Sequence, residues 1–95
     1  MKNQPLVSII IRTKNEERWI KLCLDKILEQ TYKNFEIIVV DNFSNDQTLQ
    51  KIKDYKIKNI IKVKKYFPGK SINLGIKKSS GKFIVILSGH CIPTT

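Results

Sequence analysis

Four short runs of apolar, mostly β-branched residues recur along the chain, and each run gives way to polar residues. Continuous apolar runs of this length are typical of strands buried on both faces of a parallel sheet. The predicted strands cover residues 6–11, 35–40, 57–63 and 82–87. Lysines interrupt the third run, which is therefore expected near a sheet edge, whereas the fourth run is expected to be buried.

The first segment between strands has the apolar spacing of a helix. Within residues 16–30, apolar side chains at positions 19, 20, 23, 24, 27 and 28 share one helical face. Asn15 is the predicted N-cap, and the acidic Glu16 and Glu17 suit the positive end of the helix dipole. We therefore expect a helix that begins directly after Asn15.

Two further helices are predicted from shorter signals. Ser44 and Gln47 have the spacing of a capping box, which predicts a helix through about Tyr55. A turn at residues 68–69 precedes a short predicted helix over 71–78. Strands and helices thus alternate, which predicts one α/β domain with three layers, α/β/α, around a mainly parallel sheet of about four strands.

Polar residues follow three of the predicted strands at once, at 12–16, 41–44 and 88–91. Ligands of open α/β sheets bind outside the carboxyl ends of the strands, so the sequence predicts a site there. Asp41 could accept hydrogen bonds from a ligand or could be a solvated carboxylate that caps the next turn. Arg12 could neutralise a phosphate or could be a surface cation. His90, a lone histidine, could be a ligand or a hydrogen-bonded structural residue.

The charge balance points to anionic partners. The 95 residues carry 18 Lys and Arg against 8 Asp and Glu, a net charge of +10. We rank nucleic-acid binding last, because the aromatic residues are not interleaved with the basic ones as a stacking surface requires. Gly69-Lys70-Ser71 is not a P-loop, because position 64 is a lysine. Cys23 and Cys91 fit no metal or disulfide pattern, and no apolar run is long enough to span a membrane.

Several motifs together resemble a known family. Residues 7–48, VSIIIRTKNEERWIKLCLDKILEQTYKNFEIIVVDNFSNDQT, closely resemble the N-terminal half of family 2 glycosyltransferases with the GT-A fold. The matching motifs are Thr13 to Glu16, Gln30-Thr31-Tyr32, Phe35 to Asp41, Ser44 to Thr48, Asn73-Leu74-Gly75 and Ser80 to Phe83. The resemblance implies a nucleotide-sugar donor, carrying UDP, dTDP or GDP, held at the three strand ends.

The resemblance also implies roles for single residues. The donor-binding residues would be Arg12, Thr13, Asn15, Glu16, Asp41, Asn42, Asn73, Ser88 and His90. Family members usually carry D-x-D after the last strand to hold Mn²⁺ or Mg²⁺, and this sequence has Ser88-Gly89-His90 instead. His90 would then be the metal ligand, since imidazole binds Mn²⁺. Metal dependence stays open at this point.

The family likeness further implies that residues 1–95 are the donor-binding part of a truncated domain. No catalytic residue is expected in the chain, because the general base should follow Thr95. The expected activity is glycosyl transfer to a glycan or lipid-linked hydroxyl in cell-surface polysaccharide or glycolipid synthesis. The expected location is the cytoplasm, with peripheral association at the inner face of the cell membrane left open. The alternative is a non-catalytic nucleotide-binding module or an inactive fragment.

Overall fold

The computed structural model describes residues 5–55, 57, 59–63 and 68–88. Strands and helices alternate along this part of the chain, as predicted. In order they are β1 (Val7–Thr13), α1 (Ile20–Leu28), β2 (Phe35–Asp41), α2 (Thr48–Asp54), β3 (Asn59–Lys62), α3 (Pro68–Lys78) and β4 (Phe83–Ser88).

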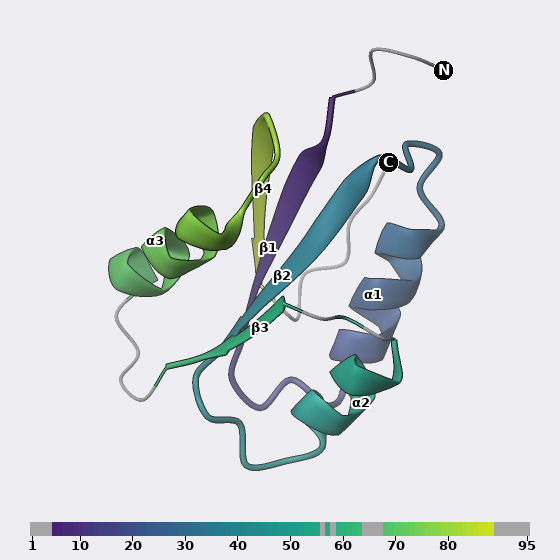
Figure 1. The fold of residues 1–95 in the computed structure, drawn as a ribbon. Helices are drawn as coiled ribbons and strands as arrows, with labels where there is room; N and C mark the ends of the chain where they lie inside the picture. Colours follow the sequence, from purple (N-terminus) through teal and green to yellow (C-terminus); the bar gives the residue numbers. More distant parts are fainter. Residues whose placement is uncertain (1–4, 56, 58, 64–67, 89–95) are drawn as a thin grey trace.

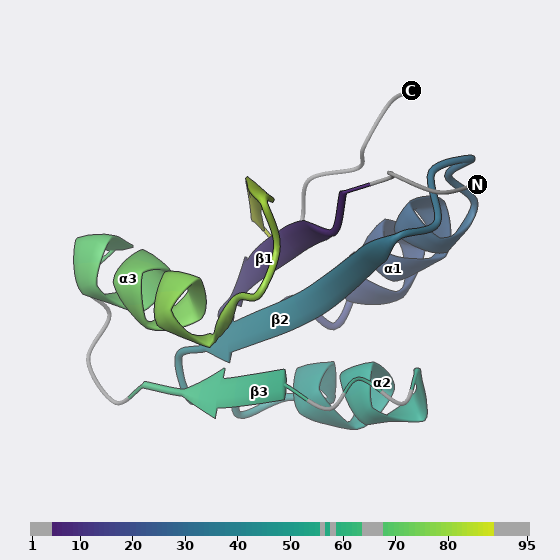
Figure 2. The same ribbon diagram turned by 45° about the horizontal axis from the view of Figure 1, so that its top comes forward.

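The strands form one parallel sheet in the order β3-β2-β1-β4. Figure 2 shows β1 and β2 in the middle of the sheet, with β3 and β4 at its edges. The predicted α/β fold with a parallel sheet of four strands is confirmed, and so is the edge position of the third strand. The register places Thr13 beside Asp41 and Arg12 beside Ser88, so polar residues meet at one end of the sheet.

Helices cover both faces of the sheet, which confirms the predicted three layers. Figure 1 shows α1 and α2 on one side of the strands and α3 on the other. The core on the first side contains Ile11, Ile20, Cys23, Leu24, Ile27, Val39 and Ile52. On the second side, Ile10, Ile38 and Val40 are buried. A Cβ atom on Gly75 would lie 2.7 Å from Ile10 Cγ2, so this glycine lets α3 approach β1 closely.

Helix α1 is shorter than the sequence predicted. It begins at Ile20 rather than after Asn15, and its N-cap is Trp19. The prediction of Asn15 as N-cap is wrong, because Asn15 has a left-handed backbone (φ 52°) and its side chain bonds to another loop. The buried face of α1 is also narrower than predicted, since Trp19 and Leu28 remain 43% and 47% exposed.

The predicted starts of the other helices are wrong as well. Helix α2 begins at Thr48, and its N-cap Gln47 makes no side-chain capping bond, so the Ser44–Gln47 capping box does not form. Residues 68–69, predicted as a turn, are the first residues of α3. Proline is favoured in the first turn of a helix, where its missing N–H has no intrahelical acceptor to lose.

The last strand is an edge strand and not the buried one that its apolar sequence predicted. It pairs with β1 on one side. Its residues Phe83, Ile84, Val85 and Ile86 are between 40% and 54% exposed. An apolar run therefore indicates a strand here but does not determine the number of neighbours the strand has.

No helix within residues 5–55, 57, 59–63 and 68–88 is long and apolar enough to cross a membrane. Cys23 is a fully buried cysteine on α1, whereas Cys91 lies outside the described residues.

A hydrogen bond joins the two helices on the first face. The Tyr55 hydroxyl donates to Asp25 Oδ1 at 2.5 Å. Desolvation, together with this bond and the nearby negative charges, raises the pKa of Tyr55 from 10.0 to about 12. Because the pKa is higher in the folded state, the stabilisation is complete below pH 10 and is lost as the pH rises through about 12.

Tyr55→Phe should therefore lower the free energy of unfolding by about 1 kcal/mol near neutral pH, the typical value of one hydrogen bond. It should also remove part of the stability loss between pH 10 and 12. Urea unfolding of both proteins over a pH series measures the effect. Identical dependence of stability on pH in the two proteins would contradict the raised pKa that we assign to Tyr55.

Candidate functional site

The candidate site is the carboxyl edge of the sheet, where β1 and β2 lead into two polar loops. We call residues 14–19 the β1–α1 loop and residues 42–47 the β2–α2 loop. Both loops lie at the same end of the sheet (Figure 1). Thr13 and Asp41 end the two neighbouring strands, and Asn42 N donates to Thr13 O at 2.9 Å. The polar residues that follow the strands are thus brought together.

Asp41 is the centre of this edge and is completely buried. Its Oδ1 accepts hydrogen bonds from Thr13 Oγ1 at 2.5 Å and from Ser44 Oγ at 2.6 Å. Its Oδ2 accepts one from Ser44 N at 2.8 Å. The interpretation of Asp41 as a solvated carboxylate is therefore wrong, although the side chain does hold the turn that follows it. A carboxylate fixed in this way has one orientation.

The two loops are joined by bonds that run in both directions between backbone and side chains. In one direction, Asn15 N donates to Ser44 Oγ at 2.9 Å and Glu16 N donates to Thr48 Oγ1 at 2.7 Å. In the other direction, Asn45 N donates to Asn15 Oδ1 and Gln47 N donates to Glu17 Oε1, both at 2.8 Å. These bonds give backbone N–H groups of both loops a hydrogen-bond acceptor, and they fix the two loops to each other.

Asp46, two residues before helix α2, bonds to the first residue of that helix, where the sequence predicted a capping box. Its Oδ1 accepts bonds from Thr48 N at 2.9 Å and from Thr48 Oγ1 at 2.5 Å. Desolvation alone would raise the pKa of Asp46, but hydrogen bonds from Thr48 and from the Glu17 backbone outweigh it and hold the pKa below the usual 3.8. Asp46 is therefore a carboxylate at neutral pH.

Two residues of the loops have left-handed backbones. Asn15 (φ 52°) is of a type that tolerates this conformation, but Phe43 (φ 45°) is not. The conformation costs a side chain other than glycine roughly 1–2 kcal/mol. Nothing in the sequence indicated it at Phe43, whose side chain is 46% exposed. Ser44, Asp46 and Thr48 were likewise missed as links between the loops.

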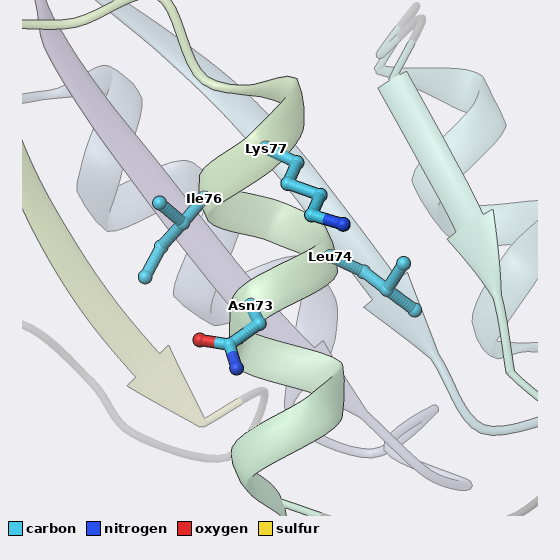
Figure 3. A pocket seen from close by; sticks show the side chains of 4 residues that line it. All are labelled: Asn73, Leu74, Ile76 and Lys77. Carbon is cyan, nitrogen blue, oxygen red and sulfur yellow. The ribbon is translucent and has the colours of Figure 1, made fainter.

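Asn73 lies apart from the two loops. It is on α3, on the face of the sheet opposite to α1 and α2. With Leu74, Ile76 and Lys77 it lines a hollow of about 440 Å³. Figure 3 shows these four side chains along the outer side of the helix. The predicted role of Asn73 near a diphosphate stays a prediction.

Of the remaining predicted site residues, the structure describes Arg12 and Ser88 but not His90. Arg12 and Ser88 are partners in the β1–β4 register, and each is partly buried. His90 lies outside the described residues. In the described part of the chain, no group of three or more His, Cys, Asp or Glu could hold a metal ion.

Comparison with known proteins identifies the family. The model of the family described as Glycosyl transferase family 2 matches residues 8–95. The chain belongs to this family. The matched range contains both loops and all the strands except the first residue of β1, so the resemblance stated from the motifs is confirmed.

Relatives in this family are much longer than the chain. A dolichyl N-acetyl-alpha-D-glucosaminyl phosphate 3-beta-D-2,3-diacetamido-2,3-dideoxy-beta-D-glucuronosyltransferase from Methanococcus voltae is 39% identical over 95 residues, covering 92% of this chain and 30% of that enzyme. The poly(ribitol-phosphate) beta-N-acetylglucosaminyltransferase TarS of Staphylococcus aureus is 34% identical over 87 residues, covering 84% of this chain and 15% of TarS. The chain thus spans less than a third of either relative.

Solved structures of similar proteins contain nucleotides. Residues 1–349 of Staphylococcus aureus TarS in complex with UDP-GlcNAc superpose with a TM-score of 0.79 at 31% identity, covering 88% of this chain and 26% of that one. The mannosyltransferase PcManGT from Pyrobaculum calidifontis, in complex with GDP-Man and Mn²⁺, superposes with a TM-score of 0.84. It is 24% identical and covers 99% of this chain and 30% of its own, so it supports the fold alone.

Proposed function

We propose that this chain is the donor-binding part of a glycosyltransferase that uses a nucleotide sugar. The observation that supports the proposal is the arrangement at the carboxyl edge of the sheet, where hydrogen bonds join the two loops around the buried Asp41. This edge is where open α/β sheets bind ligands. The TarS structure with UDP-GlcNAc, at 31% identity, supports a nucleotide-sugar donor for this chain.

The geometry suggests how the edge would receive the donor. Oδ1 of Asp41 accepts two of the described hydrogen bonds and Oδ2 accepts one. A carboxylate oxygen can accept about two, but Asp41 is fully buried, so a bond from a base or ribose to Oδ2 would require the side chains that cover it to move apart. In the structure as it stands, Asp41 would act by holding the two loops around the nucleotide. Arg12, on the neighbouring strand, would supply positive charge for the diphosphate. Thr13, Asn15, Glu16, Asn42 and Ser88 would complete the edge around the nucleotide.

The reaction itself needs groups that we do not assign to this chain. We propose that the general base lies outside residues 1–95 and deprotonates an acceptor hydroxyl. That hydroxyl would attack the anomeric carbon and displace the nucleoside diphosphate. The acceptor would be a growing cell-surface polysaccharide or a glycolipid. The cytoplasmic location stays a prediction.

The 95-residue protein should bind at least one nucleoside diphosphate weakly, with a Kd of roughly 0.1–1 mM, and should transfer no sugar. Calorimetric titration with UDP, GDP and dTDP at about 150 mM salt measures the binding, and donor turnover with simple acceptors measures transfer. Inorganic triphosphate is the control for the +10 charge, because adventitious attraction would favour it over every diphosphate. Absence of binding to all three nucleotides would contradict the proposal.

We also propose that His90 ligates Mn²⁺ beside the diphosphate. Its support is the position of His90 in the family motif, and the PcManGT structure with Mn²⁺ shows that this fold accommodates the ion in another protein. Mn²⁺ should strengthen diphosphate binding about tenfold or more above pH 7, and less below about pH 6, because a ligating imidazole must be neutral. His90→Ala should remove the gain while leaving metal-free binding unchanged. The same Mn²⁺ response in both proteins would contradict this assignment.

A further inference from the structure

Phe43 has a combination of features that packing does not explain. Its side chain is 46% exposed, and its backbone has a φ of 45°, in the left-handed region that bulky residues avoid. An apolar ring at a half-exposed position gains little from burial, and glycine would adopt the same backbone without strain. Strained residues of this kind concentrate at functional sites, where the surrounding structure holds them in place.

The surroundings of Phe43 do hold it in place. On one side, Asn42 N donates to Thr13 O at 2.9 Å, and on the other, Ser44 N donates to Asp41 Oδ2 at 2.8 Å. The carbonyl oxygen of Phe43 itself accepts a bond from Lys14 Nζ at 3.3 Å. The backbone of this turn is therefore fixed by the β1–α1 loop and by the buried carboxylate, and it presents an aromatic residue at the carboxyl edge.

The loops contain one other half-exposed aromatic residue. Trp19, 43% exposed, has the Arg18 guanidinium carbon 5.9 Å from its ring centroid, so a cation already lies over that ring. Phe43 lies closer along the chain to Asp41, with only Asn42 between them. Of the two rings, Phe43 is the better placed to meet a planar group that also hydrogen-bonds near Asp41.

We propose that Phe43 is a stacking residue for the base of the nucleotide, an inference that rests on the proposed function. A nucleobase offers a flat π-face to an aromatic ring and N–H and carbonyl groups to the polar loop residues around the buried Asp41, so one base could contact both the ring and these loops. Stacking on an aromatic ring tolerates different bases. Phe43 would therefore add affinity for the nucleoside and none for the diphosphate.

Phe43→Gly is the most informative variant, because glycine adopts the positive φ and the turn should still fold. We expect it to weaken binding of UDP and GDP about tenfold, and Phe43→Tyr to bind within about twofold of the unmutated protein. Phe83→Ala is the matched control, since Phe83 is 54% exposed but lies at the amino end of β4, and it should leave the affinity unchanged. Nuclear Overhauser effects between base protons and the Phe43 ring should be observed in the unmutated protein.

Three results would overturn the inference in distinguishable ways. If the unmutated protein binds nucleoside diphosphates and Phe43→Gly binds them equally well, the stacking role is wrong and the proposed function stands. If the unmutated protein binds none of them, the proposed function and the stacking role fall together. Equal weakening by Phe43→Gly and Phe43→Tyr would also overturn the inference, because it would indicate a distorted turn and not a lost ring.

Discussion

Replacing Asp41 by alanine is expected to lower the free energy of unfolding by about 3 kcal/mol, because it leaves three donors without their acceptor in a buried place. The affected groups are the hydroxyls of Thr13 and Ser44 and the backbone N–H of Ser44. For a chain of this size the loss corresponds to a melting temperature lower by about 12–24 °C. Thermal unfolding followed by circular dichroism measures it. Nucleotide affinity should fall as well, by roughly 1–3 kcal/mol, if the edge binds the donor.

Asp54→Ala is the matched control for this substitution. Asp54 is an exposed carboxylate on α2 that accepts a bond from Gln50 at 3.3 Å, so its loss should change stability by at most about 0.5 kcal/mol. Asp41→Asn should fall between the two, because an amide oxygen keeps part of the accepting capacity. Equal melting temperatures for Asp41→Ala and Asp54→Ala would contradict the central place that we give to Asp41.

Leu24→Ala is expected to lower the free energy of unfolding by about 2–5 kcal/mol, because the Leu24 side chain on α1 is fully buried in the core that α1 forms with the sheet. The loss combines the lost burial of the side chain with the cavity that remains. Leu24 lies in the core and not in the two loops of the candidate site. The substitution should therefore reduce nucleotide binding only by reducing the fraction of folded protein. Chemical unfolding with urea, extrapolated to water, gives the free energy directly.

Leu28→Ala tests the same change on the exposed side of the same helix. Leu28 is 47% exposed, so its replacement should change the free energy of unfolding by no more than about 0.5 kcal/mol. The sequence pattern placed both leucines on one buried face, and the structure separates them. Comparable losses from the two substitutions would favour the wider face that the sequence predicted.

The fold was predictable from the sequence because its main signals are local. Runs such as Ile9-Ile10-Ile11 and Ile37 to Val40 identify strands, and their alternation with helices determines a parallel, layered arrangement. The carboxyl edge followed from the same reasoning. What the sequence did not indicate is which residue each loop side chain contacts. Asparagine is a residue type favoured at helix N-caps, but the side chain of Asn15 accepts a hydrogen bond from Asn45, 30 residues away in the chain.

The same limit explains the other misses. The spacing of Ser44 and Gln47 is that of a capping box, which is a local pattern. The capping box does not form, because Ser44 makes hydrogen bonds to Asp41 and Asn15 instead. The exposure of β4 depends on which strands lie beside it, which its own residues do not determine. The positive φ of Phe43 had no signal in the sequence, because glycine and asparagine are the residues expected there.

The most direct test of the central claim is an amide NMR titration of the 95-residue protein with UDP and with GDP at about 150 mM salt. Our account predicts saturable shifts concentrated at residues 12–17 and 41–48, the strand ends and loops around Asp41. Little change is expected at the hollow between α1 and α2 that is lined by Lys21, Asp25, Lys51, Asp54 and Tyr55. Shifts centred on that hollow, or small unsaturated shifts spread over the lysines, would contradict a nucleotide site at the carboxyl edge.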